Sequence, residues 1–189
     1  MIISSYNIRG LGVGGAKFSS LRHLFAGIRP DILCIQETIT LAGKACAYFL
    51  RLFLGWEVTD VDASGLSGGI LCLWNPLVCD LDAYTSNAGI LLIGRLRECN
   101  HDIKLLNVYG PYRDWEAFWD RLAGSGLLRD PDLILMGDLN LTLSPLEIWG
   151  TSVWDPLMDY FNTLIREARL IDICPIDLGP TWRNGRVAE

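Results

Sequence analysis

The feature of this sequence that most constrains its fold is a run of four apolar residues followed by a glycine, an acid and an amide. The run Leu133–Met136 predicts a strand that is buried on both faces and halted by Gly137. Because side chains alternate along an extended chain, we expect Asp138 and Asn140 to point the same way and Leu139 to return to the core. This pattern is typical of a polar site on a rigid scaffold, although a turn capped by Asp138 explains it equally well.

Composition indicates a globular protein with one domain over residues 1–189. Half of the residues are apolar and seven are tryptophans, so the chain can bury a large core. No apolar run is long enough to span a membrane and no secretory signal is visible, so we expect an intracellular protein of the nucleus or cytoplasm that is not secreted. The six cysteines are scattered without CxxC spacing, and we expect small buried hydrophobes, with neither zinc nor disulfides.

The charge of the chain restricts how it could contact nucleic acid. A net charge of −6 argues against tight, non-specific binding through a basic surface. It does not exclude a nuclease, because the active site of a nuclease is itself acidic. A local basic groove remains open, and its candidates are Arg9, Lys17, Arg22, Arg183 and Arg186.

The order of the expected elements predicts the fold class. The expected strands cover residues 2–8, 32–35, 56–61, 69–74, 78–84, 89–96, 103–109, 133–136 and 170–173, and the expected helices cover 20–28, 41–53, 114–122 and 156–168. The expected helix N-caps are Ser19 or Ser20, Asp114 and Asp155. This order predicts an α/β sandwich in four layers, with two mixed β-sheets packed face to face and helices outside. Strands that end in polar residues would place Asn7, Glu37, Asp138 and Asn140 at one edge.

Five short motifs in this order support a family. They are Ser5–Gly10 (SYNIRG), Ile35–Thr38 (IQET), Ser67–Ile70 (SGGI), Asn107–Pro111 (NVYGP) and Gly137–Asn140 (GDLN). Together they resemble the endonuclease/exonuclease/phosphatase superfamily, and most of all the apurinic-type endonuclease domain of plant LINE (non-LTR) retrotransposons. The resemblance covers essentially the whole chain, including Leu170–Asp172 and Pro180–Trp182. Leu139 stands where the family more often has Phe, which is a tolerable core exchange.

The sequence departs from that family near its C-terminus. The family continues past Thr181 and Trp182 into two further strands, which carry an Asp and then a closing Asp-His pair, whereas this sequence stops at Glu189. Its two histidines, His23 on the polar side of the first helix and His101 in the turn 98–102, are expected on the surface. We therefore expect a domain without its last strands, with an unpaired strand edge and poor solubility.

The resemblance implies a role for each polar residue. Glu37 would bind Mg²⁺, or Mn²⁺ in its place, and Asp138 would orient or deprotonate the attacking water or share a second metal. Asn7 and Asn140 would hold the phosphate and the Asp138 carboxylate through amide hydrogen bonds. Tyr109 would donate to a phosphate oxygen on which charge develops. The implied reaction is metal-assisted hydrolysis of a DNA phosphodiester, which leaves a 3′-hydroxyl for priming reverse transcription.

Two further residues, Arg9 and Thr181, are candidates for DNA contacts under the same resemblance. A purely structural role is the alternative for each residue of the expected site. Glu37 and Asn7 could satisfy loop backbone, and Tyr109 could be a half-buried aromatic with a bonded hydroxyl. The implied partners are DNA and the reverse transcriptase part of a longer polyprotein, with no membrane.

Two classes of function stay open. The first is a Mg²⁺-dependent endonuclease that is a fragment of a retrotransposon polyprotein. The second is a retrotransposon-derived remnant that keeps most of the fold but lacks the C-terminal Asp and His, so that catalysis is impaired. A phosphatase acting on small phosphoesters is a third alternative, and it too is expected to need the missing histidine.

Overall fold

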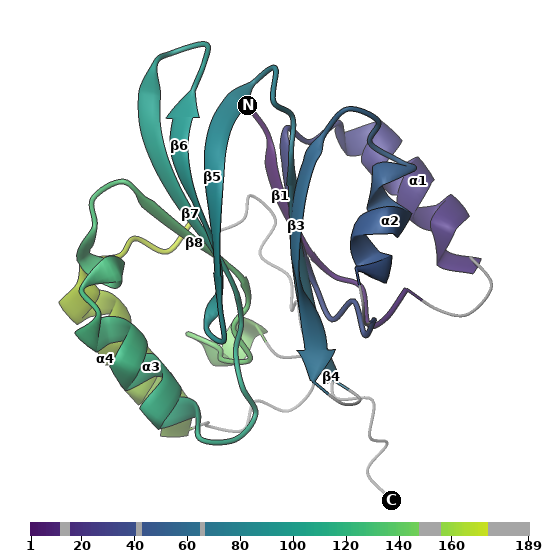
Figure 1. Ribbon diagram of the computed structural model, residues 1–189. Helices are drawn as coiled ribbons and strands as arrows, with labels where there is room; N and C mark the ends of the chain where they lie inside the picture. Colours follow the sequence, from purple (N-terminus) through teal and green to yellow (C-terminus); the bar gives the residue numbers. More distant parts are fainter. Residues whose placement is uncertain (12–15, 41–42, 65–66, 148–155, 174–189) are drawn as a thin grey trace, which may run out of the picture.

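Two four-stranded β-sheets form the body of the computed structural model, which describes residues 1–11, 16–40, 43–64, 67–147 and 156–173 (Figure 1). The first, here called the N-terminal sheet, contains β1 (Ile3–Asn7), β2 (Ile32–Gln36), β3 (Glu57–Ser64) and β4 (Ser67–Trp74). The second, the C-terminal sheet, contains β5 (Cys79–Ser86), β6 (Gly89–Leu96), β7 (His101–Tyr109) and β8 (Leu133–Asp138).

Both sheets are mixed and share one plan. The strand orders are β1-β2-β4-β3 and β5-β6-β7-β8. A parallel pair lies at one edge of each sheet, β1 with β2 and β7 with β8, and the remaining neighbours are antiparallel. The expected α/β sandwich of two packed mixed sheets is therefore confirmed.

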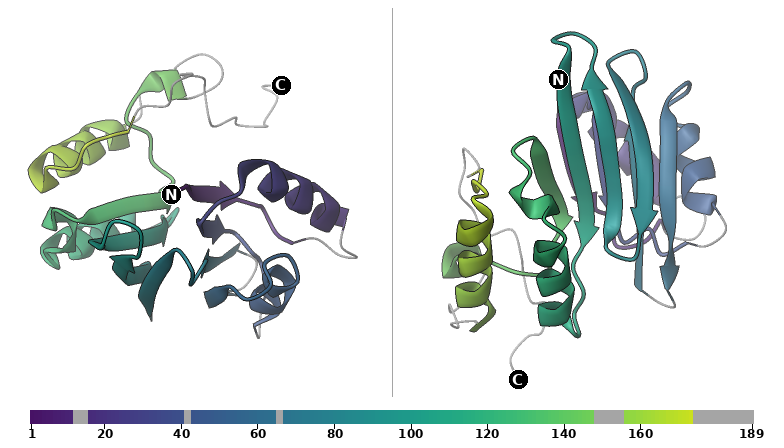
Figure 2. Two further views of the ribbon diagram at one scale, coloured as in Figure 1. Left: turned by 90° about the horizontal axis from the view of Figure 1, so that it is seen from above. Right: turned by 60° about the vertical axis from the view of Figure 1, so that its left-hand side comes forward.

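Helices cover the outer face of each sheet and complete four layers. The helices are α1 (Ala16–Ile28), α2 (Lys44–Leu50), α3 (Trp115–Gly124) and α4 (Pro156–Ala168), with short 3-10 turns at Leu127–Arg129 and Pro145–Glu147. Figure 1 shows α1 and α2 outside the N-terminal sheet and α3 and α4 outside the C-terminal sheet, and Figure 2 shows these layers from two further directions. None of the described helices combines the length and the apolar character that crossing a membrane requires.

Alternation along the strands explains why four layers form. In β2, Ile32 and Cys34 belong to the core between the sheets, whereas Leu33 and Ile35 pack with residues of α1 and α2. All four side chains are fully buried. A strand that is covered on both faces needs consecutive apolar residues, and this explains the continuous apolar run in the sequence of β2.

Two expectations about individual elements are wrong. The first helix begins at Ala16, so Ser19 and Ser20 lie inside it and are not its N-cap; Ala16 and Lys17 are good helix formers and extend the helix toward β1. Residues 170–173 form no strand, and the exposed Ile171 and Ile173 explain this, because they face no partner sheet within the described chain.

The central strand β8 also differs from its prediction. It continues through Gly137 to Asp138, and it is half-buried because only β7 pairs with it among the described strands. Asp114 does precede α3, but its φ of 52° turns the side chain away from capping, and it makes no cap hydrogen bond. Asp155 lies outside the described residues.

The cysteines largely follow the prediction. Cys34, Cys72 and Cys79 are buried free thiols, and burial raises the pKa of the Cys34 thiol and raises that of Cys79 to about 11. Both therefore stay protonated and unreactive at neutral pH. Two cysteines differ: Cys46 is half-buried on α2, and Cys99 is exposed in the loop between β6 and β7. Cys174 is outside the described residues.

Close contact between β7 and β8 generates a first prediction. Gly137 has a φ of 132°, and a Cβ at this position would lie 1.9 Å from the carbonyl oxygen of Val108. We expect Gly137→Ala to lower the free energy of unfolding by roughly 2–4 kcal/mol, because backbone strain and the clash add. Gly124→Ala is the matched control: its Cβ meets nothing within 4 Å in α3, so it should be neutral or stabilising by up to ~1 kcal/mol. Urea denaturation measures both, and equal effects would contradict the prediction.

Candidate active site

The two parallel strand pairs end at the same edge of the sandwich, and polar side chains gather there. Asn7 is the last residue of β1 and Glu37 directly follows β2. Tyr109 and Asp138 are the last residues of β7 and β8, and they are paired in register. All four side chains are partly buried. The structure thus brings together residues that lie up to 131 positions apart in the sequence.

One amide joins the two carboxylates of this edge. Asn7 Nδ2 donates to Glu37 Oε1 at 2.8 Å and to Asp138 Oδ2 at 2.6 Å. Tyr109 donates its hydroxyl to the same Glu37 oxygen at 3.0 Å. A neutral amide donor between two acids offsets part of their mutual repulsion and holds both in one orientation. Asn7 therefore links the N-terminal sheet to the C-terminal sheet at the site.

Asn140 reaches the site by a different route from the one expected. It lies beyond the end of β8 with a φ of 53°, so the alternation of an extended strand does not apply to it. Its backbone N–H donates to Asp138 Oδ1 at 3.1 Å, and its side-chain Nδ2 donates to the carbonyl of Gly110. Asn140 thus orients Asp138 and ties the end of β8 to the segment after β7.

Two site residues hold strained backbone conformations. Glu37, with a φ of 52°, and Asn140 are both left-handed, which costs a residue with a side chain on the order of 1–3 kcal/mol. Hydrogen bonds fix the turn at Glu37, because its carbonyl accepts from Gly10 N at 2.6 Å and Thr38 N donates to Gly69 O at 3.0 Å. These bonds hold the backbone at Glu37 in the conformation that places its carboxylate at the end of β2.

Of the basic residues expected in a DNA-binding groove, one bonds to the protein backbone and two are exposed. Lys17 Nζ donates to the carbonyls of Ile8, Arg9 and Gly10 at 2.7, 2.8 and 2.7 Å, so it stabilises the loop after β1. Arg9 is exposed on this loop, and its N–H donates to Asn7 Oδ1 at 2.9 Å. Arg22 is exposed on α1. The other candidates, Thr181, Arg183 and Arg186, lie outside the described residues.

Tyr109 is held in its protonated form. Burial raises the pKa of its hydroxyl well above the usual value, and the neighbouring Tyr112 hydroxyl and the Glu37 carboxylate raise it further. The two rings are in edge contact, with centroids 6.3 Å apart. At neutral pH Tyr109 is therefore a hydrogen-bond donor, which is the form that could stabilise a developing negative charge.

The donor set at this edge suits a hard cation. Within the described residues no hydrogen bond reaches Glu37 Oε2, whereas Oε1 accepts two. No cluster of three or more His, Cys, Asp or Glu that could hold a metal occurs in the described part of the chain. Mg²⁺ does not need such a cluster, because it is usually held by one or two carboxylates and keeps several waters. Glu37, with Asp138 beside it, fits this mode.

Neither histidine of the sequence lies at the site. His23 is exposed on α1. His101 is the first residue of β7, and not part of the preceding turn as expected, whereas Tyr109 is the last residue of that strand. Eight residues of extended chain separate them, which is roughly 26 Å at about 3.3 Å per residue. The imidazole of His101 therefore cannot reach the carboxylates, and within the described residues His23 makes no hydrogen bond to them.

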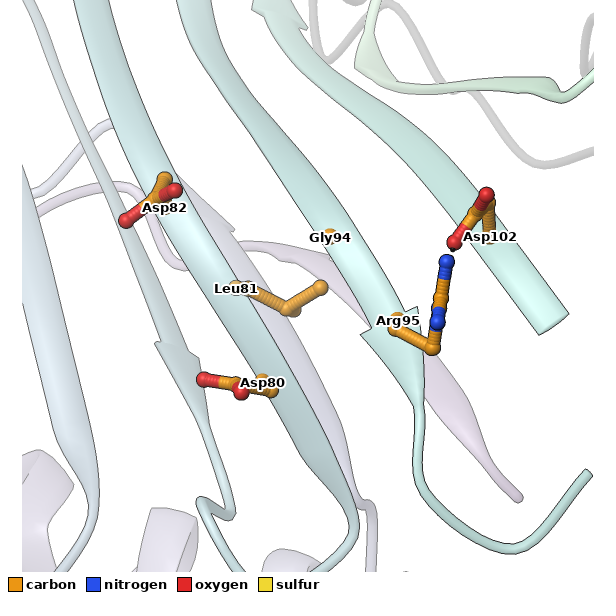
Figure 3. A pocket seen from close by; sticks show the side chains of 6 residues that line it. All are labelled: Asp80, Leu81, Asp82, Gly94, Arg95 and Asp102. Carbon is orange, nitrogen blue, oxygen red and sulfur yellow. Dashed lines mark hydrogen bonds and ion pairs between the residues drawn. The ribbon is translucent and has the colours of Figure 1, made fainter. Parts of the chain in front are cut away.

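A shallow hollow on the outer face of the C-terminal sheet is separate from this site. It is lined by Asp80, Leu81, Asp82, Gly94, Arg95 and Asp102 (Figure 3). Arg95 Nε donates to Asp102 Oδ1 at 2.7 Å, and this bond lowers the pKa of the Asp102 carboxyl. The charges of the hollow are largely paired across neighbouring strands, and Asp102 lies at the opposite end of β7 from Tyr109.

The fold agrees with the comparison to known proteins. The model of the endonuclease/exonuclease/phosphatase family matches residues 4–175. The chain belongs to this family. A search of curated proteins by sequence finds no match.

Solved structures of similar fold include several nucleases. A 3′ phosphatase from Neisseria bound to a product DNA hairpin is 16% identical, with a TM-score of 0.65 over 88% of this chain and 70% of that protein. An AP endonuclease from Archaeoglobus fulgidus is 18% identical, with a TM-score of 0.65 over 88% and 71%. The AP endonuclease of Leishmania major is 14% identical, with a TM-score of 0.68 over 88% and 66%. At these identities the similarity is one of fold.

Sequence reasoning missed two features of this family member. The first is the anchoring role of Lys17. The second is a buried polar group behind the site, formed by Ser5, Gln36 and Asn107. A signal for it was present, because Asn107 interrupts an apolar run in β7 and Gln36 closes an otherwise apolar β2.

The raised pKa of Tyr109 generates a prediction for alkaline solution. Above pH 10 the unfolded chain loses the tyrosine proton while the folded chain keeps it, so the free energy of unfolding falls as pH rises. Tyr109→Phe removes this group, so we expect the free energy of unfolding of the variant to fall less steeply between pH 10 and 11 than that of the unmodified chain. The difference between the two slopes should be less than about 1.4 kcal/mol per pH unit, which is the limit for one titrating group. Urea denaturation at a series of pH values measures it. The control Tyr84→Phe alters an exposed tyrosine on β5; if Tyr109→Phe leaves the pH slope at the wild-type value, the prediction is wrong.

Proposed function

We propose that the site is that of a Mg²⁺-dependent hydrolase of DNA phosphodiesters, an endonuclease that nicks target DNA for a retrotransposon. The observation that carries this proposal is the Asn7 amide, which joins Glu37 and Asp138 across the two sheets. Two carboxylates held side by side and half exposed suit the binding of a cation and the activation of a water molecule.

Each residue has a part in the proposed reaction. Glu37 would hold Mg²⁺ through Oε2, to which no described residue donates, and the bound ion would neutralise charge on the phosphoryl group. Asp138 would accept a proton from the attacking water, in the orientation set by Asn7 Nδ2 and by the backbone N–H of Asn140. Tyr109 would donate its hydroxyl to a phosphate oxygen. Arg9, exposed on the adjacent loop, would contact the DNA backbone, as would Thr181.

Two lines of support bear on the substrate and the biological setting. DNA as substrate is supported by family membership and by the fold shared with a DNA-bound 3′ phosphatase and with AP endonucleases. The retrotransposon role rests on the five motifs, whose closest resemblance is to the endonuclease domain of plant LINE elements. The partner in that setting would be the reverse transcriptase of the same polyprotein, in the nucleus or cytoplasm.

Within the described residues neither histidine bonds to the carboxylates of the site, and this favours a second candidate. This is a catalytically impaired, retrotransposon-derived protein that binds the cation and DNA but cuts very slowly. A positioned acid–base group contributes roughly 10²–10⁴-fold to a rate, and the loss of one charge-stabilising donor costs about 10²–10³-fold. A site without this histidine would therefore act more slowly by several orders of magnitude.

Cation binding tests the part of the proposal that both candidates share. We expect Glu37→Gln to weaken Mn²⁺ binding at least tenfold, because it removes the open carboxylate oxygen from the site. Isothermal titration with Mn²⁺ measures the affinity. Glu57→Gln, at an exposed position at the start of β3, is the matched control and should bind as the unmodified chain does. Equal affinities for Glu37→Gln and the unmodified chain would refute a cation site at Glu37.

DNA nicking separates the two candidates. We expect the 189-residue chain to nick supercoiled plasmid in Mg²⁺ no faster than its Asp138→Ala variant, because within the described residues no histidine bonds to the site carboxylates. Gel electrophoresis of plasmid over time measures both rates. If the unmodified chain is clearly faster, another residue replaces the histidine and the first candidate holds for this chain.

A further inference from the structure

A second polar layer lies directly behind the site, inside the core between the sheets. Gln36 Nε2 donates to Asn107 Oδ1 at 2.7 Å and to Ser5 Oγ at 3.0 Å. Asn107 Nδ2 in turn approaches the carbonyl of Leu71 at 3.2 Å. Gln36 is 1% exposed and Asn107 is fully buried. The layer therefore connects β1, β2 and β4 of the N-terminal sheet to β7 of the C-terminal sheet.

This buried layer and the site are neighbours along three strands. Ser5 and Asn7 are two residues apart on β1, and Asn107 and Tyr109 are two residues apart on β7, so each pair faces the same way. Gln36 is joined to Glu37 by one peptide bond. The bond from Gln36 to Asn107 thus runs beside the bond from Tyr109 to Glu37, and both span the gap between the sheets.

Stability alone does not require amides at these positions. Replacing both partners of a buried hydrogen bond with apolar side chains of similar shape is nearly neutral for stability, whereas removing only one partner is costly. Apolar packing, however, tolerates small displacements between two sheets, and a hydrogen bond has a preferred length and direction. What the amides add is a defined position of one sheet relative to the other.

We propose that Gln36 and Asn107 are positioning residues, which set the register between the sheets and thereby hold Glu37 at the distance from Asp138 that cation binding needs. The cation in this inference rests on the proposed function, whereas the alignment of the two sheets by Gln36 and Asn107 does not. Glu37 follows β2 directly, and backbone hydrogen bonds on both sides hold its left-handed turn. A displacement of β2 relative to β7 therefore changes the distances from Glu37 to Tyr109 and to Asp138. Ser5, which accepts from Gln36, supports the same arrangement from β1.

The test compares the full chain with an apolar double variant, Gln36→Met with Asn107→Leu. Two readouts are used: Mn²⁺ affinity by titration calorimetry, and hydrogen exchange of the Thr38 and Gly10 amides, which close the turn at Glu37. We expect a melting temperature within a few degrees of the unmodified chain, an approximately tenfold loss of Mn²⁺ affinity, and roughly tenfold faster exchange of these two amides. Exchange of the Leu92 amide on β6 should not change.

Two controls separate positioning from general weakening of the core. Ile90→Val alters a buried residue opposite Asn107 in the register of β6 and β7 and should leave both readouts unchanged. If the double variant does not fold, Ser5→Ala carries the test, with Ser4→Ala on the other face of β1 as its matched control. Ser5→Ala should lower Mn²⁺ affinity and speed the two amides two- to threefold, and Ser4→Ala should do neither.

Each outcome decides the inference. Unchanged affinity and unchanged exchange in a folded double variant, or equal losses in Ile90→Val, would overturn it, as would equal behaviour of Ser5→Ala and Ser4→Ala. If the unmodified chain binds no Mn²⁺, the proposed cation site fails, and amide exchange alone then decides whether Gln36 and Asn107 position the turn at Glu37.

Discussion

The structure depends on the contact between two sheets whose inner faces are apolar along most of their length and polar at one end. On β1 the inward positions change from Ile3 to Ser5 to Asn7, and on β8 they change from Ile134 and Met136 to Asp138. The polar ends coincide because the parallel pair of each sheet lies at the same edge. Side chains at that edge are supported from behind by a packed core, so they are held on rigid elements and not on free loops.

Placing Glu37 and Asp138 side by side has an electrostatic cost, and Asn7 offsets it. Two negative charges at short range repel, more strongly where protein excludes water. A neutral amide that donates to both needs no counter-charge of its own, and its bond to Glu37 goes to Oε1, so that Oε2 accepts no hydrogen bond from the described residues. The left-handed conformations of Glu37 and Asn140 add to the cost. The site is thus a locally unfavourable arrangement that the rest of the fold maintains.

Much of the fold could be predicted from periodicity, because fully covered strands such as β2 have continuous apolar runs and β6 is bounded by turns. The edge that gathers Asn7, Glu37 and Asp138 was predictable for the same reason, since each residue closes a strand. The conformation of Asn140 was not, because alternation ceases where the strand ends. The start of α1 was missed because the serines resembled a cap. Nothing in a sequence pattern shows that Gln36 and Asn107 meet, because their contact depends on how two sheets are aligned.

The three carbonyls bound by Lys17 affect how this edge could interact with a polyanion. Strong DNA binders neutralise many phosphates and release the associated counterions, and this makes their affinity fall steeply with salt. Here the ammonium nearest to the loop after β1 is already occupied by the protein's own backbone, and Arg9 is the cation that the loop presents to solvent. DNA held at this loop would release few counterions. The salt dependence that this loop itself contributes would be small, because it offers the side chain of Arg9 and not that of Lys17.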